Sequence, residues 1–239
     1  MKRALVTGAS GGIGAAIARQ LAADGHHVIV HANRRHDKAT AVAAEIAAAG
    51  GSAEAVAFDI TDADATAAAL DAILAAGPVQ ILVNNAGRHA DAVFPGMGAK
   101  QWHTVMDVNL NGFYNVTQPL TMPMLRTRWG RIVTITSVAG LVGNRGQVNY
   151  AAAKGALHAA TKSLALELAS RNVTVNAVAP GIIATEMSDG SFDKATIERL
   201  VPMKRAGQPD EVADLVAFLV SERAAYITGQ ILSINGGMV

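Results

Sequence analysis

Two side chains whose types and spacing suit proton transfer lie four residues apart, Tyr150 and Lys154. The alanine-rich run around them favours a helix, in which residues four apart share one face. An ammonium beside a phenol stabilises the phenolate. Lys154 is therefore expected to lower the pKa of Tyr150 and make it a proton donor to a developing alkoxide near neutral pH. Such a pair is also common as packing plus a solvated charge, and these two residues alone do not decide between the alternatives.

The elements that must position this pair follow a repeating pattern. Short runs of branched residues predict strands at 4–7, 28–31, 55–58, 80–84, 131–136, 173–179 and 231–234. Alanine-rich segments with helical periodicity lie between them, for example at 13–23, 38–49 and 61–76. Asp62 and Pro209 stand where helix starts are expected. The alternation predicts one α/β domain over residues 1–239, with a doubly wound, Rossmann-type parallel sheet of about seven strands and helices on both faces. Because the strand runs are apolar without alternation, both faces of the sheet are expected to be buried.

Composition excludes several function classes. The net charge is +1 and no basic run is interleaved with aromatic residues, which argues against a nucleic-acid partner. The chain has no cysteine, which excludes disulfides, thiolate metal sites and cysteine nucleophiles, and its histidines are scattered, so we expect no metal site. No apolar stretch approaches the ~20 residues of a membrane span, and no apolar signal segment precedes the first strand. We therefore expect a cytoplasmic protein without a membrane partner.

A glycine-rich turn connects the first predicted strand to the first helix. Its glycines are Gly8, Gly12 and Gly14, with Ser10 and Ile13 between them. Glycines there allow a tight turn and a close approach to a pyrophosphate, whose charge is met by the N–H groups of the helix start. The spacing departs from the Gly-x-Gly-x-x-Gly fingerprint, but its place in a βαβ array predicts that these five residues bind a dinucleotide.

The ends of the second and third strands bear on which dinucleotide binds. The second strand is followed by Asn33 and Arg34 rather than by an acid, which favours the 2′-phosphate of NADP(H). The alternative is that the cations here form a solvated turn. Asp59 and Ile60 follow the third strand and are expected to contact the adenine. Asp59 could equally start the next helix.

Two further segments carry predictions. Consecutive asparagines, Asn84 and Asn85, follow the fourth strand, where they either brace neighbouring strands or line the nucleotide cleft with Ala86 and Gly87. Residues 182–207 are rich in polar residues and glycine with weak periodicity. Such long loops are usually functional, so we predict a partly helical lid over a substrate cleft; a surface insertion without a role is the alternative.

With these features in place, the whole sequence resembles the short-chain dehydrogenase/reductase family. The matching segments are 7–14, 84–87, Asn109 in Asp-Val-Asn-Leu, Ser137, Tyr150 with Lys154, 180–181, 226–229 and 235–237. Within that family the chain looks most like the 3-oxoacyl-[acyl-carrier-protein] reductases.

The resemblance implies a mechanism. A hydride passes from the nicotinamide to a ketone carbon while Tyr150 protonates the carbonyl oxygen. Ser137 holds that oxygen, although by itself it could be a residue of a strand-end turn. Lys154 binds the nicotinamide ribose and keeps the phenol acidic, and Asn109 supports a water chain that returns protons. Further cofactor contacts are implied for Pro180, Gly181, Ile183 and Thr185 together with Asn85, Ala86 and Gly87.

The resemblance also implies partners. A homotetramer is built through helices near residues 100–128 and 147–170 and the C-terminal strand. Acyl carrier protein docks on Arg128 and Arg171, which could instead be solvated helix-end cations. Where many members have an arginine in the glycine turn, this chain has Gly11, which leaves Arg34 and Asn33 to hold the 2′-phosphate.

Three functions follow in order of preference. The first is NADPH-dependent reduction of a 3-oxoacyl carrier protein in fatty acid, polyene or polyketide synthesis. The second is an NADP(H)-dependent alcohol or ketone dehydrogenase that acts on a free small substrate. The third is a non-catalytic nucleotide-binding regulator, against which the complete set of Asn109, Ser137, Tyr150 and Lys154 argues.

Overall fold

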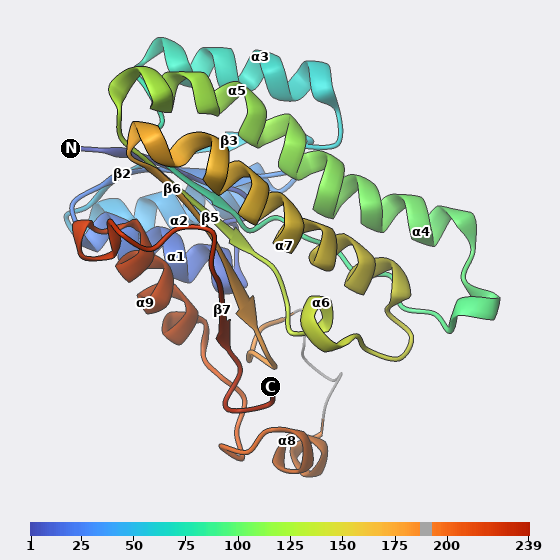
Figure 1. Cartoon of the computed structure of the whole chain (residues 1–239). Coiled ribbons are helices and arrows are strands. Elements are labelled where there is room, and N and C mark those ends of the chain that lie inside the picture. The colour runs from blue at the N-terminus through green and yellow to red at the C-terminus, as the bar shows by residue number, and fades with distance from the viewer. Residues whose placement is uncertain (187–192) are drawn as a thin grey trace.

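The computed structural model describes residues 1–186 and 193–239 and contains one seven-stranded sheet (Figure 1). All neighbouring strands are parallel, in the order β3-β2-β1-β4-β5-β6-β7. The strands are β1 (Arg3–Val6), β2 (His27–Ala32), β3 (Ser52–Ala57), β4 (Ile81–Asn84), β5 (Gly130–Ile135), β6 (Val173–Pro180) and β7 (Ile231–Ile234). The predicted fold class and every predicted strand are confirmed, with boundaries that differ by at most a few residues.

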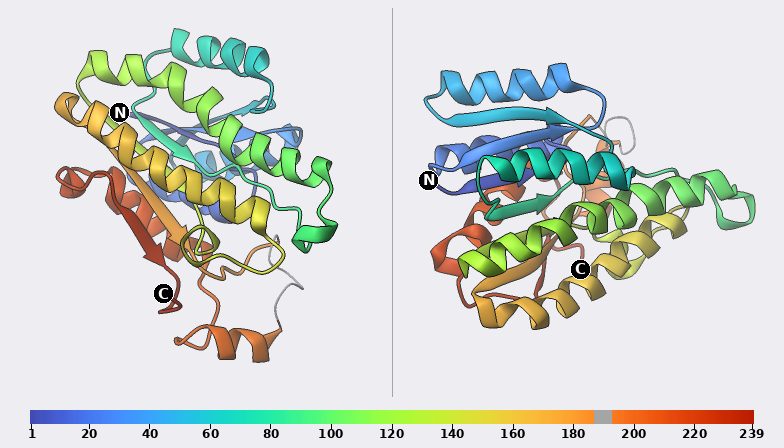
Figure 2. Two further views of the ribbon diagram at one scale, coloured as in Figure 1. Left: turned by 45° about the vertical axis from the view of Figure 1, so that its right-hand side comes forward. Right: turned by 90° about the horizontal axis from the view of Figure 1, so that it is seen from above.

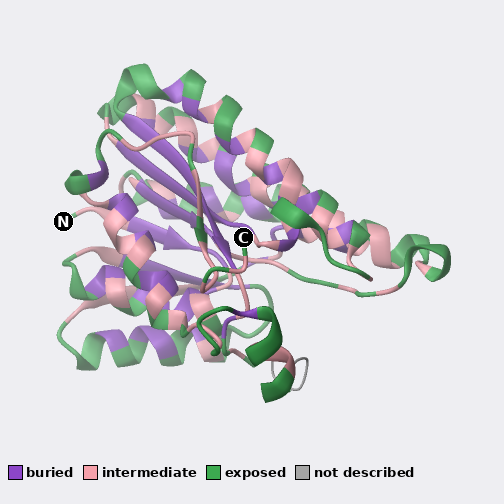
Figure 3. Cartoon of the chain, turned by 60° about the horizontal axis from the view of Figure 1, so that its bottom comes forward, coloured by how far each residue is buried: buried purple, intermediate pink, exposed green. Residues whose placement is uncertain are grey.

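Helices cover both faces of the sheet, as expected (Figure 2). One face carries α1 (Gly12–Ala23), α2 (His36–Ala48) and α9 (Pro209–Val220), and the other carries α3 (Ala63–Ala75), α5 (Gly112–Thr127) and α7 (Val148–Leu168). Two apolar clusters, one on each face, bury every residue of the inner strands except Arg3 and His27, the first residues of β1 and β2. The expectation of full burial is wrong for β3 and β7, in which no residue is buried (Figure 3). These are the two edge strands, and each has a neighbour on one side only.

Shorter elements complete the described chain. They are η1 (Phe94–Gly96), α4 (Ala99–Met106), a π-helical turn η2 (Asp107–Asn111), α6 (Ala139–Val142), η3 (Ala169–Arg171), α8 (Lys194–Leu200) and η4 (Glu222–Ala224). Both predicted helix starts are confirmed. The Asp62 carboxylate accepts a hydrogen bond from the Ala65 N–H at 3.0 Å, and Pro209 is the first residue of α9.

The two ends of the predicted lid segment are joined. Ile183 and Gly207 form a parallel bridge, in which the Gly207 N–H donates to the Ile182 carbonyl and the Ala184 N–H donates to the Gly207 carbonyl, both at 2.9 Å. Helix α8 confirms that the segment is partly helical. Residues 187–192 lie outside the described residues, and the role of a lid stays a prediction.

A buried arginine anchors the amino edge of the sheet. The Arg131 side chain is fully buried and donates to the carbonyls of Gly130 (2.9 Å) and Asn172 (3.2 Å). Its guanidinium also lies 3.4 Å from the Glu222 carboxylate, which accepts from Trp129 at 2.9 Å and from Lys2 at 3.2 Å. This group ties the start of β5 to the N-terminus and to η4.

Candidate active site

The candidate site lies at the carboxyl edge of the sheet. Strands β1 and β4 are neighbours there, although β2 and β3 separate them in the chain. In a doubly wound sheet this reversal of strand order opens a crevice in which ligands bind. The glycine turn follows β1 and Asn85 follows β4, so both border the crevice.

The glycine turn needs its glycines for conformation and for space. Gly8 and Gly12 have φ of 63° and 54°, values that other residues rarely adopt. A Cβ on Gly14 would lie 2.5 Å from the Gly8 carbonyl oxygen and would also overlap the Asn85 amide. A Cβ on Gly11 would meet nothing within 4 Å. Ser10 is half-buried, and Ile13 packs from the first turn of α1 onto the core.

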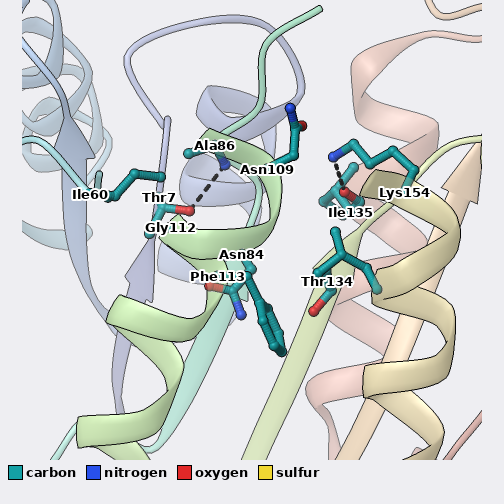
Figure 4. Close-up of a pocket in the computed structure, with 11 residues that line it drawn as sticks. Thr7, Ile60, Asn84, Ala86, Asn109, Gly112, Phe113, Thr134, Ile135 and Lys154 are labelled. Carbon is teal, nitrogen blue, oxygen red and sulfur yellow. Dashed lines mark hydrogen bonds between the residues drawn. The ribbon is translucent and has the colours of Figure 1, made fainter. Parts of the chain in front are cut away.

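The Asn85 side chain braces this turn. Its amide donates to the carbonyls of Thr7 (2.9 Å) and Gly8 (3.0 Å), while the Thr7 hydroxyl accepts from the N–H groups of Asn85 and Ala86. The neighbouring Asn84 donates to the Thr117 hydroxyl at 3.0 Å. The bracing role of the asparagines is therefore confirmed. Asn84 and Ala86 also line a small cavity (Figure 4), and the role of this segment as a wall of the nucleotide cleft stays a prediction.

The predicted adenosine end lies beyond β2 and β3. Asn33 and Arg34 are exposed. The Asp59 carboxylate accepts from the N–H and the hydroxyl of Thr61, and these bonds, with smaller contributions from Asn33 and Arg34, hold its pKa below the usual range. Because Asp62 caps α3, the alternative in which Asp59 starts that helix is wrong. Ile60 is buried close to Gly112, and its contact with adenine stays a prediction.

Tyr150 and Ser137 meet above the carboxyl end of β5. Their side chains share a hydrogen bond, and the Ser137 hydroxyl also accepts from the Ala139 N–H at 3.1 Å. Burial raises the pKa of Tyr150 to about 12; the bond to Ser137 lowers it and the nearby Asp91 charge raises it further. The expectation that Lys154 lowers this pKa is wrong, because removal of water from the phenol dominates.

The Lys154 ammonium is directed elsewhere. It is buried and donates to the Ile135 carbonyl at 2.8 Å, and it lies 5.5 Å from the centre of the Tyr150 ring. Burial lowers its own pKa to about 8. The two residues do lie one helical turn apart on α7, as predicted, and Figure 4 shows the lysine bonded to Ile135 at the end of β5.

Asn109 reaches the same cavity from the π-helical turn. Its amide donates to the carbonyls of Arg88 (2.7 Å) and Val105 (2.8 Å). Its Oδ1 atom is buried and has no hydrogen-bond partner among the described residues. A Cβ on Gly87 would lie 3.0 Å from this oxygen and 3.4 Å from the Lys154 Nζ, so these two polar atoms flank Gly87. A buried amide oxygen of this kind fits a water-mediated link to the lysine.

The remaining residues predicted to contact the cofactor lie at the end of β6 and just after it. The Pro180 carbonyl accepts from the Val138 N–H, and the Gly181 N–H donates to the Ile234 carbonyl, both at 2.9 Å. Ile183 is buried, and the Thr185 methyl group would lie 3.6 Å from a Cβ on Gly12. Thr185 therefore sits beside the glycine turn.

Sequence reasoning did not identify Asp91, whose side chain connects two loops beside the site. Its carboxylate accepts from the Gln147 amide at 2.9 Å and lies 3.1 Å from the His89 Nδ1. The Ala92 N–H donates to the Gly146 carbonyl, so the loop after β4 is fastened to the loop before α7. The only available signal was a polar residue in a loop beside the predicted site.

The two arginines predicted to dock a carrier protein lie away from this site. Arg128 and Arg171 are both exposed. Arg128 lies two residues before the start of β5 and Arg171 lies two residues before the start of β6, and the first residues of these two strands, Gly130 and Val173, are paired. Both therefore lie at the amino edge of the sheet, opposite Tyr150. The described residues contain no cluster of acidic or histidine side chains that could hold a metal ion. None of the helices in the described part of the chain could cross a membrane.

Comparison with known proteins places this geometry in a family. Residues 2–196 match the family model described as short chain dehydrogenase. The chain is 46% identical over 236 residues to the 3-oxoacyl-[acyl-carrier-protein] reductase FabG of Aggregatibacter actinomycetemcomitans, covering 98% of each chain. It is 46% identical to the FabG of Staphylococcus aureus strain Mu50, covering 99% of this chain and 98% of that one. A 3-oxoacyl-[acyl-carrier-protein] reductase of Synechocystis is 47% identical, with 99% and 96% covered. The chain therefore belongs to the short chain dehydrogenase family.

Proposed function

We propose that this protein is an oxidoreductase that reduces a 3-oxoacyl-[acyl-carrier-protein] to the 3-hydroxyacyl form, with NADPH as the hydride donor, in fatty acid or related polyene or polyketide synthesis. The observation that carries the proposal is the meeting of Ser137, Tyr150, Lys154 and Asn109 at one edge of the sheet. Near-full-length identity to reductases of that name supports the substrate class.

The crevice suits a nicotinamide dinucleotide. The glycine turn is packed so closely at Gly14 that a Cβ there would overlap it, whereas the space outside Gly11 is open. The start of α1 offers N–H groups to a pyrophosphate, and the exposed Arg34 suits a 2′-phosphate. Residues 180–185 would hold the nicotinamide end. Bound there, NADPH would supply the hydride.

The high pKa of Tyr150 fits the direction of reduction. A phenol with a pKa of about 12 is protonated throughout the neutral range, which is the state required to give a proton to a carbonyl oxygen. Ser137, which already bonds the phenol, can hold the same oxygen beside it. Lys154 and the unpartnered Oδ1 of Asn109 face the same cavity and suit a path by which the phenolate regains its proton.

Carrier docking and assembly belong to the same proposal. Arg128 and Ser137 stand at opposite ends of β5, roughly 30 Å apart at ~3.3 Å per residue. Docking on Arg128 and Arg171 therefore serves the catalytic site of a neighbouring subunit, which makes docking depend on the homotetramer. Exposed apolar side chains on α5 and α7 support such contacts: Tyr114, Met122 and Leu166.

The decisive experiment measures NADPH oxidation with acetoacetyl carrier protein and with free ketones. We expect turnover of the carrier-bound ketone, and a fall of about 10²-fold or more in Tyr150→Phe, in line with the loss of a general acid. Tyr226→Phe, which changes a fully exposed tyrosine, is the matched control. Turnover of free ketones alone would favour the dehydrogenase of small substrates. Full activity in Tyr150→Phe would contradict the mechanism, whereas a parent that binds NADPH but reduces neither kind of ketone would favour the nucleotide-binding regulator.

Docking is tested by charge reversal. Arg128→Glu and Arg171→Glu are expected to raise KM for the carrier-bound ketone at least several-fold while KM for a free ketone stays unchanged. Arg126→Glu, which changes an exposed arginine two residues before Arg128, is the control. An equal effect on both substrates, or a monomeric mass in light scattering, would contradict docking across subunits.

A further inference from the structure

A histidine at the end of β2 lies beneath the glycine turn. His31 is 1% exposed, and its imidazole stands between two backbone groups from other strands. The Gly8 N–H donates to its Nδ1 at 3.1 Å, and its Nε2 lies 2.9 Å from the Phe58 carbonyl oxygen. The ring also packs on the Phe58 ring, with centroids 4.2 Å apart. One side chain thus connects the turn after β1 to the residue after β3.

The two partners fix the chemical form of this ring. A backbone N–H can only donate, so the Nδ1 must accept and carries no proton. A carbonyl can only accept, so the Nε2 carries the proton and donates it to Phe58. The neutral Nε2–H form alone satisfies both bonds. Burial favours the same form, since it lowers the pKa of His31 to about 4.

His31 holds the turn by its main chain as well. The Ala9 N–H donates to the His31 carbonyl at 2.8 Å, beside the bond from Gly8 to the ring. Both N–H groups are therefore directed toward β2. Gly8 is confined on its other side, because a Cβ there would lie 2.9 Å from the Ala86 Cα. The position of the turn that starts α1 is set between His31 and the end of β4.

We propose that His31 is a positioning residue for the nicotinamide dinucleotide. In its neutral Nε2–H form it fastens the glycine turn to the end of β3, and so sets the affinity for the pyrophosphate from beneath the turn, without contact with the ligand. The inference rests on the proposed NADPH site. It implies that loss of the acceptor for the Gly8 N–H weakens cofactor binding and leaves the chemical step unchanged.

Three variants separate the two hydrogen bonds. In His31→Asn, the side-chain Oδ1 is the same number of bonds from the backbone as the histidine Nδ1, so it can accept the hydrogen bond from the Gly8 N–H. In His31→Gln, the side-chain amide nitrogen takes the place of the histidine Nε2. This variant can donate to the Phe58 carbonyl but has no acceptor for the Gly8 N–H. His31→Phe keeps the ring and loses both bonds. His27→Phe is the matched control: His27 is also on β2 and bonds β3 through Ser52, but it lies at the amino edge.

The experiment measures the Kd of NADPH by fluorescence titration and kcat at saturating NADPH. We expect Kd within about threefold of the parent for His31→Asn and His27→Phe. Kd should rise about tenfold for His31→Gln and His31→Phe, because a buried N–H loses its acceptor. We expect kcat to be unchanged in all four. Circular dichroism verifies folding, and if His31→Phe does not fold, the comparison of Asn with Gln decides.

Several results would overturn the inference. They are an unchanged Kd in both His31→Gln and His31→Phe, an equal loss in His31→Asn and His31→Gln, or a kcat that falls as much as the affinity. A parent that binds NADPH but does not reduce the carrier-bound ketone would contradict the proposed substrate and leave His31 standing. A parent that binds no NADPH would contradict both.

Discussion

Replacement of Lys154 by methionine is expected to stabilise the protein while it removes activity. The Lys154 ammonium is buried and has one hydrogen-bond acceptor, the Ile135 carbonyl. Burial lowers its pKa from 10.5 to about 8. At 1.36 kcal/mol per pKa unit, the charged lysine costs the folded state about 3 kcal/mol below pH 8. Methionine has a similar shape without the charge, and loss of the bond to Ile135 offsets about 1 kcal/mol.

The net expectation at pH 7 is a gain of about 2 kcal/mol in the free energy of unfolding for Lys154→Met. This corresponds to an increase in Tm of about 4–8 °C for a chain of this size. The folded pKa lies below the unfolded one, so between pH 8 and 10.5 the unfolded parent holds more protons than the folded parent. The parent therefore gains stability as pH rises through this window, and the advantage of the variant disappears by about pH 10.

Urea denaturation at pH 7 and pH 10, without cofactor and at one protein concentration, measures both quantities. Lys162→Met, which changes an exposed lysine two turns along α7, is the control and should show no pH-dependent difference from the parent. The reasoning is refuted if Lys154→Met is less stable than the parent at pH 7. It is also refuted if the difference between the two proteins is the same at both pH values.

Three other substitutions probe separate parts of the molecule. Glu222→Gln should lower the free energy of unfolding by about 0.5–1 kcal/mol at pH 7, because the Glu222 side chain is 66% exposed and solvent screens its ion pairs. Hydrogen bonds from Lys2 and Trp129 lower the Glu222 pKa, so urea titrations should show the loss vanishing as pH falls below 4.5. Arg34→Ala should raise KM for NADPH about tenfold or more without changing KM for NADH. An equal change in both KM values would mean that the 2′-phosphate binds elsewhere. Arg35→Ala, which changes the neighbouring exposed cation, is the control. Gly14→Ala should abolish NADPH binding in a fluorescence titration because its Cβ meets the turn, while Gly11→Ala, in extended backbone beside open space, should bind normally.

The pKa of Tyr150 shows where a local pattern misleads. The spacing of Tyr150 and Lys154 correctly predicts a shared helical face, from which a lowered tyrosine pKa was expected. The fold instead buries the phenol and turns the ammonium toward Ile135, a residue 19 positions earlier in the chain. Desolvation depends on everything that packs around a group, and a spacing of four residues carries no information about it.

The sequence alone determined the order of the elements, the parallel sheet, the glycine turn and the residues that gather near Tyr150. The elements and the turn follow from local signals, namely hydrophobic periodicity, helix caps, and glycines between a strand and a helix, whereas Ser137 and Asn109 follow from the family resemblance. Only the tertiary structure decided the rest. It gave His31 two partners from other strands, left the Oδ1 of Asn109 without one among the described residues, and put Arg128 at the edge opposite the site. Those outcomes depend on contacts between residues far apart in the chain, which strand order creates and local sequence does not encode.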